Sequence, residues 1–462
     1  ALTRVPQNLD PAAFEELQSR WSAIGIGSLT TVPVTQASID FTDDPSLAPQ
    51  AYRLTVDRGR AAIASADPDG AFYGIVTLAQ MASRSSNGSW VVPCARIEDR
   101  PKLQWRILSD DVSRGPLPTM QYFEERIRTI AAFKMNGYSP YMENAFVDPA
   151  NPLPSPLDGI TPAQLRELAR YAARFHVALI PEQQTFAHMH NTLSVEQYAS
   201  AAELPHGFLL SPADPLSQAY VQSTIDAELA AVPHPPLFHI GSDETATLGL
   251  GTTQTYVAQH GLLRAFADHV DAMQKIVAPS GARIMLWGDA IDKDAAIMPL
   301  LPHNAVIVNY QYAAQFNFAK SISRVASGGF DQIVAPGASN WNEIYPKIDT
   351  AVPNERNFIN AGKAANVLGA FETVWHDDGE SLYEATWYPV LYAAAQAWEG
   401  RDVTPEAFAQ TYPSAFFGAD DPQYAHDAQA LGHVVGALET SEYDATNALF
   451  WTDPFDAPAQ AR

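Results

Sequence analysis

Two neighbouring carboxylates, Asp243 and Glu244, follow a short apolar run at residues 237–240 and the pair Gly241-Ser242. A strand buried on both faces is typical of a parallel sheet, and polar residues at its carboxyl end lie where α/β folds place their chemistry. An isolated Asp-Glu pair also fits an acidic turn or a helix N-cap. The sequence favours an acid–base role because His239 precedes the pair and because other predicted strands end in polar residues in the same way.

Polar and aromatic residues follow most of the strands that we predict after residue 100. In a barrel the carboxyl ends of the strands converge on one mouth, so we expect these side chains to share a site. An aromatic residue taken alone is more often core than pocket, but rings that recur after strands beside carboxylates suit a sugar, whose C–H faces stack on rings and whose hydroxyls need hydrogen bonds. The predicted binding residues are Arg106, Glu143, Asn144, His188, Trp287, Asp289, Tyr310, Tyr312, Trp341, Trp375 and Asp377.

Strands alternate with helices over the middle of the chain. The predicted strands are 105–109, 138–142, 177–180, 237–240, 283–287, 305–309, 332–335 and 368–374. Apolar residues at helical spacing predict helices at 120–133, from 161 onward, at 262–277 and at 386–398. This alternation predicts a (β/α)8 TIM barrel. An open doubly wound sheet is the alternative, although the first turn lacks a Gly-rich phosphate loop.

A small α/β domain is predicted before the barrel. Its expected helices are 10–21 and 71–81, and its expected strands are 38–41, 52–56, 61–66 and 90–97. We therefore predict three parts: an N-terminal α/β domain at 1–99, the barrel at 100–400 and a C-terminal helical extension at 401–462 that packs on the barrel.

Composition limits the possible partners. The chain has 462 residues, 47% of them hydrophobic, and a formal net charge of −24. This charge argues against nucleic acid and anionic membrane surfaces as partners, and no apolar run is long enough for membrane insertion. The single cysteine, Cys94, excludes an internal disulfide and a multi-cysteine metal site. A chain that opens on Ala1 is compatible with a processed precursor, so secretion or a periplasmic location is one expectation; the compartment and the oligomeric state stay open.

A series of segments resembles one known family. It comprises Gly-Ala-Phe-Tyr-Gly at 70–74, Arg-Ile-Glu-Asp-Arg-Pro at 96–101, Trp-Arg at 105–106, Asp-Val-Ser-Arg at 111–114, Phe-Lys-Met-Asn at 133–136, Ile-Pro-Glu at 180–182, Ala-His at 187–188 and His-Ile-Gly-Ser-Asp-Glu at 239–244. In this order the segments resemble glycoside hydrolase family 20, the β-N-acetylhexosaminidases, over about residues 40–400.

The resemblance implies an activity and roles for single residues. It implies a retaining, exo-acting enzyme that removes terminal GlcNAc or GalNAc from an oligosaccharide or glycoconjugate, without a cofactor or metal. Glu244 would be the general acid/base, and Asp243 would orient the 2-acetamido group of the substrate. Arg106 would bind sugar hydroxyls beside His188. The walls of the acetamido pocket would be Trp287 and Trp375, and Asp377 would bind the far hydroxyls.

Several positions depart from the family pattern. Ser242 stands where the family has a second glycine, and the strand end at 139–144 lacks the usual His and Asp. Tyr310 or Tyr312 replaces the middle tryptophan of the pocket, and Asn340-Trp341 occupies the neighbourhood of the tyrosine that holds the acetamide oxygen. The chain therefore resembles a divergent branch, in which the residue that holds this oxygen stays open.

The adjacency of the two carboxylates itself indicates a mechanism. Retaining glycosidases commonly place two carboxyl groups ~5 Å apart across the scissile bond, one of them as the nucleophile. Neighbouring residues at a strand end point in diverging directions and do not easily face each other across a sugar. The pair suits substrate-assisted catalysis, in which the acetamide oxygen attacks the anomeric carbon and gives an oxazolinium ion.

Two other functions remain as alternatives. The His188-Met189-His190 spacing occurs in metal-dependent deacetylases and amidohydrolases, where Asp243 or Asp289 could complete a site. A sugar-binding barrel without catalysis is the second alternative, although Asp243 and Glu244 are both present.

Overall fold

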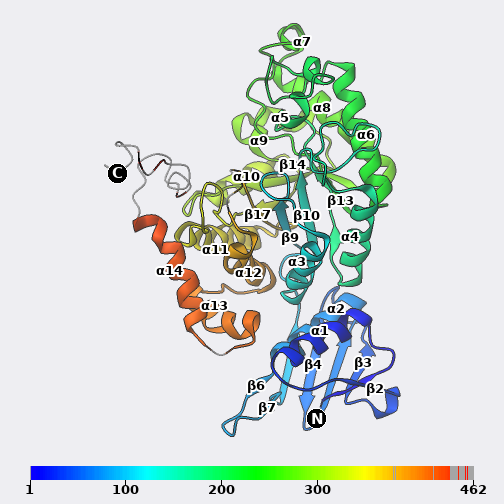
Figure 1. Cartoon of the computed structure of the whole chain (residues 1–462), viewed down its shortest axis with the longest axis vertical. Helices are drawn as coiled ribbons and strands as arrows, with labels where there is room; N and C mark the ends of the chain where they lie inside the picture. Colours follow the sequence, from blue (N-terminus) through cyan, green and yellow to red (C-terminus); the bar gives the residue numbers. More distant parts are fainter. Residues whose placement is uncertain are drawn as a thin grey trace.

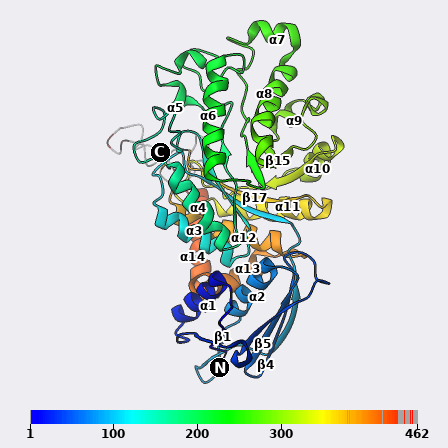
Figure 2. The same cartoon turned by 90° about the vertical axis from the view of Figure 1, so that its right-hand side faces the viewer.

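The computed structural model describes residues 2–437 apart from 378, 380 and 420, together with 446, 453 and 455. A small α/β unit lies at one end of the molecule, next to a large barrel, and the helices after residue 400 lie beside the barrel (Figure 1). The view turned by 90° shows that the first two helices lie between the small sheet and the barrel (Figure 2).

The N-terminal unit is a four-stranded sheet with two helices. The strand order is β3-β5-β4-β8, and β3 pairs with β5 in parallel while the other pairs are antiparallel. The bounds are β3 (Ile39–Asp43), β4 (Tyr52–Asp57), β5 (Arg60–Ser65) and β8 (Ala95–Asp99), with helices α1 (Pro11–Ala23) and α2 (Pro68–Gln80). Both helices begin with an aspartate N-cap followed by proline; this start was predicted for α1, whereas α2 begins three residues before the predicted residue 71.

The single strand predicted at 90–97 is wrong. The segment contains two strands: β7 (Trp90–Val91) pairs with β6 (Ser83–Arg84) in a hairpin, and β8 joins the main sheet. Pro93 lies between them, and proline has no N–H to donate to a ladder. A further pair, β1 (Arg4–Pro6) and β2 (Thr30–Val32), completes the unit.

The predicted (β/α)8 barrel is confirmed. All strand pairs are parallel, and β17 pairs with β9 to close the barrel. The strands are β9 (Trp105–Asp111), β10 (Gly137–Met142), β11 (Ala178–Leu179), β12 (Glu182–Gln183), β13 (Leu237–His239), β14 (Arg283–Trp287), β15 (Val306–Tyr310), β16 (Asp331–Ala335) and β17 (Gly369–Val374). Two short segments, β11 and β12, both pair with β10 and form one barrel strand interrupted at Pro181.

Helices cover the outside of the barrel. They are α3 (Met120–Ala132), α4 (Pro162–Arg174), α6 (Pro215–Ala231), α8 (Leu262–Val277), α10 (Phe318–Ser327), α11 (Ile348–Ala365) and α12 (Trp387–Trp398), with short helices α5 (His190–Leu193), α7 (Gln254–His260) and α9 (Asp289–Lys293). In α4, Thr161 and Gln164 form a capping box, and Leu165, Leu168 and Ala172 are buried as their spacing predicts.

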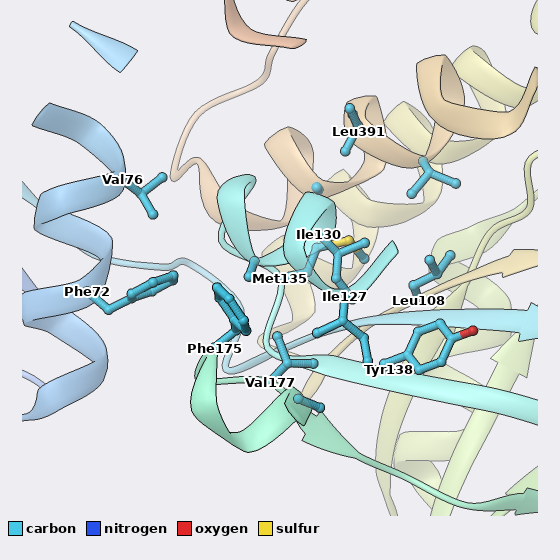
Figure 3. Close-up of a cluster of buried hydrophobic side chains, with 14 of the residues drawn as sticks. Phe72, Val76, Leu108, Ile127, Ile130, Met135, Tyr138, Phe175, Val177 and Leu391 are labelled. Carbon is cyan, nitrogen blue, oxygen red and sulfur yellow. The ribbon is translucent and has the colours of Figure 1, made fainter. Parts of the chain in front are cut away.

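Two of the four apolar clusters among the described residues bear most directly on this arrangement. One fills the barrel and includes Ile107, Met285, Trp287 and Phe371. The other continues from the N-terminal unit into the outer layer of the barrel, and Figure 3 shows Phe72 of α2 facing Phe175. The N-terminal unit therefore packs against the amino-terminal end of the barrel through a shared core.

The described C-terminal part is helical, as predicted. It comprises α13 (Pro405–Tyr412), the π-helix η6 (Pro413–Phe417) and α14 (Gln423–Ala437), which packs on α11. The rest of the extension predicted to residue 462 lies outside the described residues, save 446, 453 and 455. The three domain boundaries stay predictions. Within the described part of the chain, no helix is long and apolar enough to cross a membrane.

Candidate active site

A pocket of about 300 Å³ lies at the carboxyl ends of the barrel strands. It is lined by Arg114, Tyr141, His188, Asp243, Glu244, Trp287, Tyr310, Tyr312, Trp341, Trp375 and Asp377. The structure thus brings together most of the residues that the sequence places at the mouth, and adds Arg114 and Tyr141.

The turn after β13 sets the direction of the two carboxylates. Gly241, Ser242 and Glu244 all have positive φ, at 66°, 76° and 50°. A Cβ on Gly241 would lie 2.0 Å from Oε1 of Gln184, so only glycine fits there. The turn leaves the Asp243 side chain 16% exposed and the Glu244 side chain 63% exposed.

Asp243 is held by two neighbours inside the pocket. Its Oδ1 accepts a hydrogen bond from Gln184 Nε2 at 2.9 Å, and its Oδ2 lies 3.2 Å from His188 Nε2. Burial raises the pKa of Asp243, but the hydrogen bond and charge of His188 and the hydrogen bond from Gln184 hold it below its ordinary value. Asp243 is therefore ionised at neutral pH.

Glu244 lies at the edge of the pocket. Its Oε2 is 3.5 Å from His188 Nε2. Its backbone N–H donates to Oδ2 of Asp289 at 3.2 Å, and Lys293 Nζ donates to the same oxygen at 2.7 Å. Asp289, predicted to bind sugar, follows β14 as expected but does not line the pocket; it holds the backbone of Glu244, and its sugar contact stays a prediction.

His188 carries a positive charge between the two carboxylates. Burial lowers the pKa of His188, but the hydrogen bond and charge of Asp243, with the charges of Glu143 and Glu244, raise it to about 9. A cation at this position compensates the repulsion between Asp243 and Glu244.

Arg114 and Asp377 form a second charged group on the pocket wall. Arg114 Nη1 lies 2.7 Å from Asp377 Oδ1, and Arg114 Nε donates to Asp111 at 2.7 Å. Asp111 also accepts the backbone N–H groups of Ser113 at 3.0 Å and His376 at 3.0 Å. One buried carboxylate therefore joins the end of β9 to the loop after β17.

Aromatic rings form a continuous wall beside the carboxylates. The ring centroids of Trp287 and Trp375 are 5.7 Å apart, those of Trp287 and Tyr310 are 5.5 Å apart, and those of Tyr310 and Tyr312 are 5.5 Å apart. Trp341 continues the wall at 4.8 Å from Tyr312. The indole N–H of Trp375 donates to the Tyr312 hydroxyl at 2.9 Å.

Arg106 is not at the mouth, and its predicted position is wrong. It lies near the start of β9, where it is buried and donates to the carbonyl oxygens of Leu103 and Lys134. It also donates to Gln50 and Tyr73 of the N-terminal unit. The side chain therefore joins the N-terminal unit to the opposite end of the barrel.

Glu143 and Asn144 lie beside the pocket instead of in its wall. Glu143 accepts the Tyr141 hydroxyl at 2.9 Å and lies 4.0 Å from Arg114 Nε. Asn144 donates to the Pro154 carbonyl at 2.8 Å and thereby holds its loop. Their prediction as substrate contacts is not supported by their positions.

Three residues around the pocket were missed as site residues: Arg114, Tyr141 and Gln184. The signal for Arg114 is its place three residues after Asp111, at the carboxyl end of its strand. Tyr141 precedes Glu143 by two residues, so both share one side of the strand end. Gln184 follows β12 directly, but nothing in its residue type indicates a contact with Asp243.

Comparison with known proteins gives two family matches. Residues 2–100 match "Glycosyl hydrolase family 20, domain 2", and residues 155–401 match "Glycosyl hydrolase family 20, catalytic domain". The chain is 34% identical over 92 residues to a beta-hexosaminidase from Akkermansia muciniphila, which covers 20% of this chain and 18% of that protein. It is 23% identical over 426 residues to beta-hexosaminidase subunit alpha from Bos taurus, which covers 83% of this chain and 76% of that protein.

The fold resembles solved structures as well. The chitobiase of Flavobacterium johnsoniae has a TM-score of 0.75 at 18% identity, with 94% of this chain and 71% of that chain covered. At this identity the likeness concerns the fold.

Proposed function

The chain belongs to glycosyl hydrolase family 20, and from this premise we propose that it is a retaining, exo-acting β-N-acetylhexosaminidase. Its substrates are glycosides with a terminal, non-reducing GlcNAc or GalNAc, and the 2-acetamido group of that sugar is the nucleophile. The observation that carries the proposal is the adjacent pair Asp243 and Glu244, with one carboxylate buried against His188 and the other at the pocket edge.

The two carboxylates take different tasks. Glu244, at the open edge, protonates the leaving oxygen and later deprotonates the attacking water. Asp243, ionised and deeper in the pocket, accepts the acetamide N–H and stabilises the positive charge that develops on nitrogen. The acetamide oxygen attacks the anomeric carbon as the leaving group departs, and water then opens the oxazolinium ion, so that two inversions give net retention.

Among the described residues, the pocket lining offers no third carboxylate without a cationic partner for a covalent intermediate. Among the described residues that line it, the acidic ones are Asp243, Glu244 and Asp377, and Asp377 is paired with Arg114 at 2.7 Å. A carboxylate nucleophile would need to lie across the scissile bond from the acid, and two adjacent residues do not provide this geometry. The substrate's own oxygen fills this role.

The aromatic wall encloses the acetamido group and the sugar ring. The Tyr312 hydroxyl already accepts the indole N–H of Trp375. The Tyr310 hydroxyl makes no hydrogen bond within the described residues, and its pKa is raised by burial and by the charges of Asp289 and Asp243. We assign Tyr310 as the donor to the acetamide oxygen, because its proton is free and an anionic form is disfavoured.

Arg114 and Asp377 bind hydroxyls of the terminal sugar, in the role expected of Arg106. The guanidinium lies over the Tyr141 and Trp375 rings at 5.3 Å from each centroid, so its position is fixed before substrate arrives. Polar groups fixed in this way discriminate strongly between sugars, because a missing hydroxyl leaves them unpaired.

The two alternative functions, a metal-dependent deacetylase and a non-catalytic sugar-binding barrel, would each need a different set of residues in the pocket. Within the described part of the chain, no group of three or more His, Cys, Asp or Glu side chains is arranged to hold a metal ion, and His188 is directed at Asp243. A non-catalytic barrel would need neither an acid at the pocket edge nor an ionised partner beside it.

The test is hydrolysis of nitrophenyl β-N-acetylglucosaminide and β-N-acetylgalactosaminide beside the plain β-glucoside and β-galactoside, with and without a chelator. We expect the acetamido sugars to react at least ~10³-fold faster, because the plain sugars lack the intramolecular nucleophile, and the first product to be the β-anomer. Saturable binding without turnover would favour the sugar-binding alternative. Release of acetate, abolished by the chelator, would favour the metal-dependent deacetylase.

A further inference from the structure

Gln184 lies at the meeting point of the pocket's polar groups. It follows β12, is 1% exposed and does not line the pocket. Its Nε2 donates to Asp243 Oδ1 at 2.9 Å and to the Tyr141 hydroxyl at 3.2 Å. Its Oε1 accepts the backbone N–H of Ser242 at 3.4 Å and lies over Gly241, where a Cβ would be 2.0 Å away.

These contacts fix the orientation of the carboxamide. Its amino group has two N–H donors and faces two oxygens, and its carbonyl oxygen faces a backbone N–H. In the reverse orientation the carbonyl oxygen would face the ionised carboxylate of Asp243. A single orientation therefore satisfies every group around the side chain.

The hydrogen bonds continue from Gln184 through Tyr141 to Glu143, each residue donating to the next. Its hydroxyl accepts from Gln184 and donates to Glu143 Oε1 at 2.9 Å. Its ring packs edge-on against Trp375, with centroids 4.9 Å apart and an interplanar angle of 89°, and the Arg114 guanidinium lies over it. Gln184 thus contacts both the Asp243 side of the pocket and the wall that holds Arg114.

We propose that Gln184 is a positioning residue that fixes the Asp243 carboxylate, the turn at Gly241-Ser242 and the Tyr141 wall relative to one another. It acts through Asp243, so the proposal rests on the proposed function. It holds Asp243 in the orientation that accepts the acetamide N–H and favours its ionised form.

The neighbouring Gln183 provides a matched control. It is also buried, at 2% exposed, but its Nε2 donates only to the backbone carbonyls of Glu143 at 3.0 Å and Gln184 at 2.9 Å. Gln→Met at either position keeps the length of the side chain and removes its hydrogen bonds. Both variants therefore lose a buried amide, and only Gln184→Met loses the contact with Asp243.

The experiment compares Gln184→Met, Gln183→Met and Gln184→Glu with the wild type. It measures kcat and KM for nitrophenyl β-N-acetylglucosaminide across the acidic pH range, and the thermal midpoint. For Gln184→Met we expect kcat to fall about 10–100-fold, as for loss of a hydrogen bond to a charged group, and the acidic limb of the profile to move to higher pH. Gln184→Glu should move the limb further, because a second carboxylate beside Asp243 disfavours its ionisation.

Other titratable groups act on Asp243 and are unchanged in every variant, so differences between variants report on position 184. They are Tyr141, Glu182, His188, His239, Asp289, Tyr310 and Tyr312. Gln183→Met should lower the thermal midpoint and leave the acidic limb in place.

Equal kcat values and equal acidic limbs in Gln184→Met and Gln183→Met would overturn the positioning role while the proposed function stands. If Gln184→Met does not fold, an unshifted limb in Gln184→Glu overturns it as well. A wild type inactive on acetamido sugars, or an Asp243→Asn variant as active as the wild type, would overturn the proposed function itself, and the role of Gln184 with it.

Discussion

Asp243 and Glu244 are neighbours in the chain, but they have different surroundings. Asp243 is surrounded by His188, Gln184 and the pocket aromatics, which keep it ionised while it is largely buried. Glu244 is mostly exposed, and its carboxylate oxygen Oε2 lies 3.5 Å from His188 Nε2. In the mechanism we propose, this difference separates the fixed anion, Asp243, from the acid and base, Glu244.

Replacing Glu244 by Gln should separate acid catalysis from binding. For natural glycosides with poor leaving groups we expect kcat to fall about 10²–10⁴-fold, the usual contribution of a general acid. For nitrophenyl leaving groups, which need no proton, the first step should lose much less. Steady-state kinetics on both substrate types test this, and equal losses on both would assign Glu244 a structural role.

Loss of the His188 proton should lower both the activity and the stability of the protein at alkaline pH. Its pKa in the folded protein is raised to about 9, above the ordinary value of 6.5, so its contribution to stability is complete below pH 6.5 and is lost as the pH rises to about 9. We expect activity to fall near pH 9, where His188 of the folded protein loses its proton, and His188→Asn to remove this limb.

His176 is the control for the pH prediction. It pairs with Asp10 and Asp69 of the N-terminal unit, which raise its pKa to about 9 against the effect of burial. His176→Asn should therefore flatten the alkaline loss of thermal stability but leave the alkaline limb of activity unchanged. A limb that survives in His188→Asn would contradict the assignment.

The residue types of the site could be read from the sequence more easily than their positions. An arginine near a carboxylate pair was expected, and the chain offers Arg106 and Arg114 around the same strand. That strand, β9, has seven residues, so its ends lie about 20 Å apart. Only the strand bounds decide that Arg106 is at the wrong end and Arg114 at the mouth.

Among the secondary-structure elements, the turn after β13 is the one that places Asp243 and Glu244 at the end of the barrel sheet. His239 Nδ1 accepts the N–H of Gly241 at 3.0 Å, and the Ser242 hydroxyl donates to the Ile240 carbonyl at 3.3 Å. These bonds stabilise the positive φ of Ser242, a backbone conformation that residues in a β-strand do not adopt. The strand itself was predictable from its apolar run, whereas the turn also depends on its contacts with Gln184, the residue after β12.

Gly241→Ala tests how tightly this turn is packed. The new Cβ would displace the Gln184 carboxamide from Gly241 and with it the donor to Asp243. We expect kcat to fall about tenfold or more, as for loss of one hydrogen bond to a charged group. The thermal midpoint should fall as well, since alanine at positive φ costs about 1 kcal/mol. Kinetics equal to those of the wild type would show that the turn adapts without moving Asp243.

In the whole molecule, the pocket and the contact with the N-terminal unit lie at opposite ends of the barrel. Arg106 and the core around Phe72 and Phe175 lie at the amino-terminal end of the barrel, and the pocket lies at the carboxyl end. The alternation of elements predicted this barrel well because each strand and helix carries its own periodicity. The junction could not be predicted, because its contacts join residues far apart in the chain.

Arg106→Ala should therefore destabilise the protein without affecting the chemistry. The substitution leaves the carbonyls of Leu103 and Lys134 without the Arg106 donor, and buried unsatisfied groups cost ~1–3 kcal/mol each. We expect a lower unfolding midpoint in urea and unchanged kcat/KM per folded molecule. Arg114→Ala should instead lower kcat/KM and change the unfolding midpoint less. A lower kcat/KM in fully folded Arg106→Ala would contradict the placement of Arg106 away from the pocket.

Attack by the substrate's own acetamide oxygen can be tested with nitrophenyl β-glucosaminides whose N-acyl group is acetyl, fluoroacetyl, difluoroacetyl or trifluoroacetyl. The measurement is kcat/KM for each of the four substrates. Each fluorine withdraws electrons from the carbonyl oxygen and weakens its attack on the anomeric carbon, while the leaving group stays the same. If the acetamide oxygen is the nucleophile, kcat/KM falls steeply with each added fluorine. Rates that do not depend on the number of fluorines, as expected when a carboxylate of the protein attacks instead, would contradict attack by the acetamide oxygen.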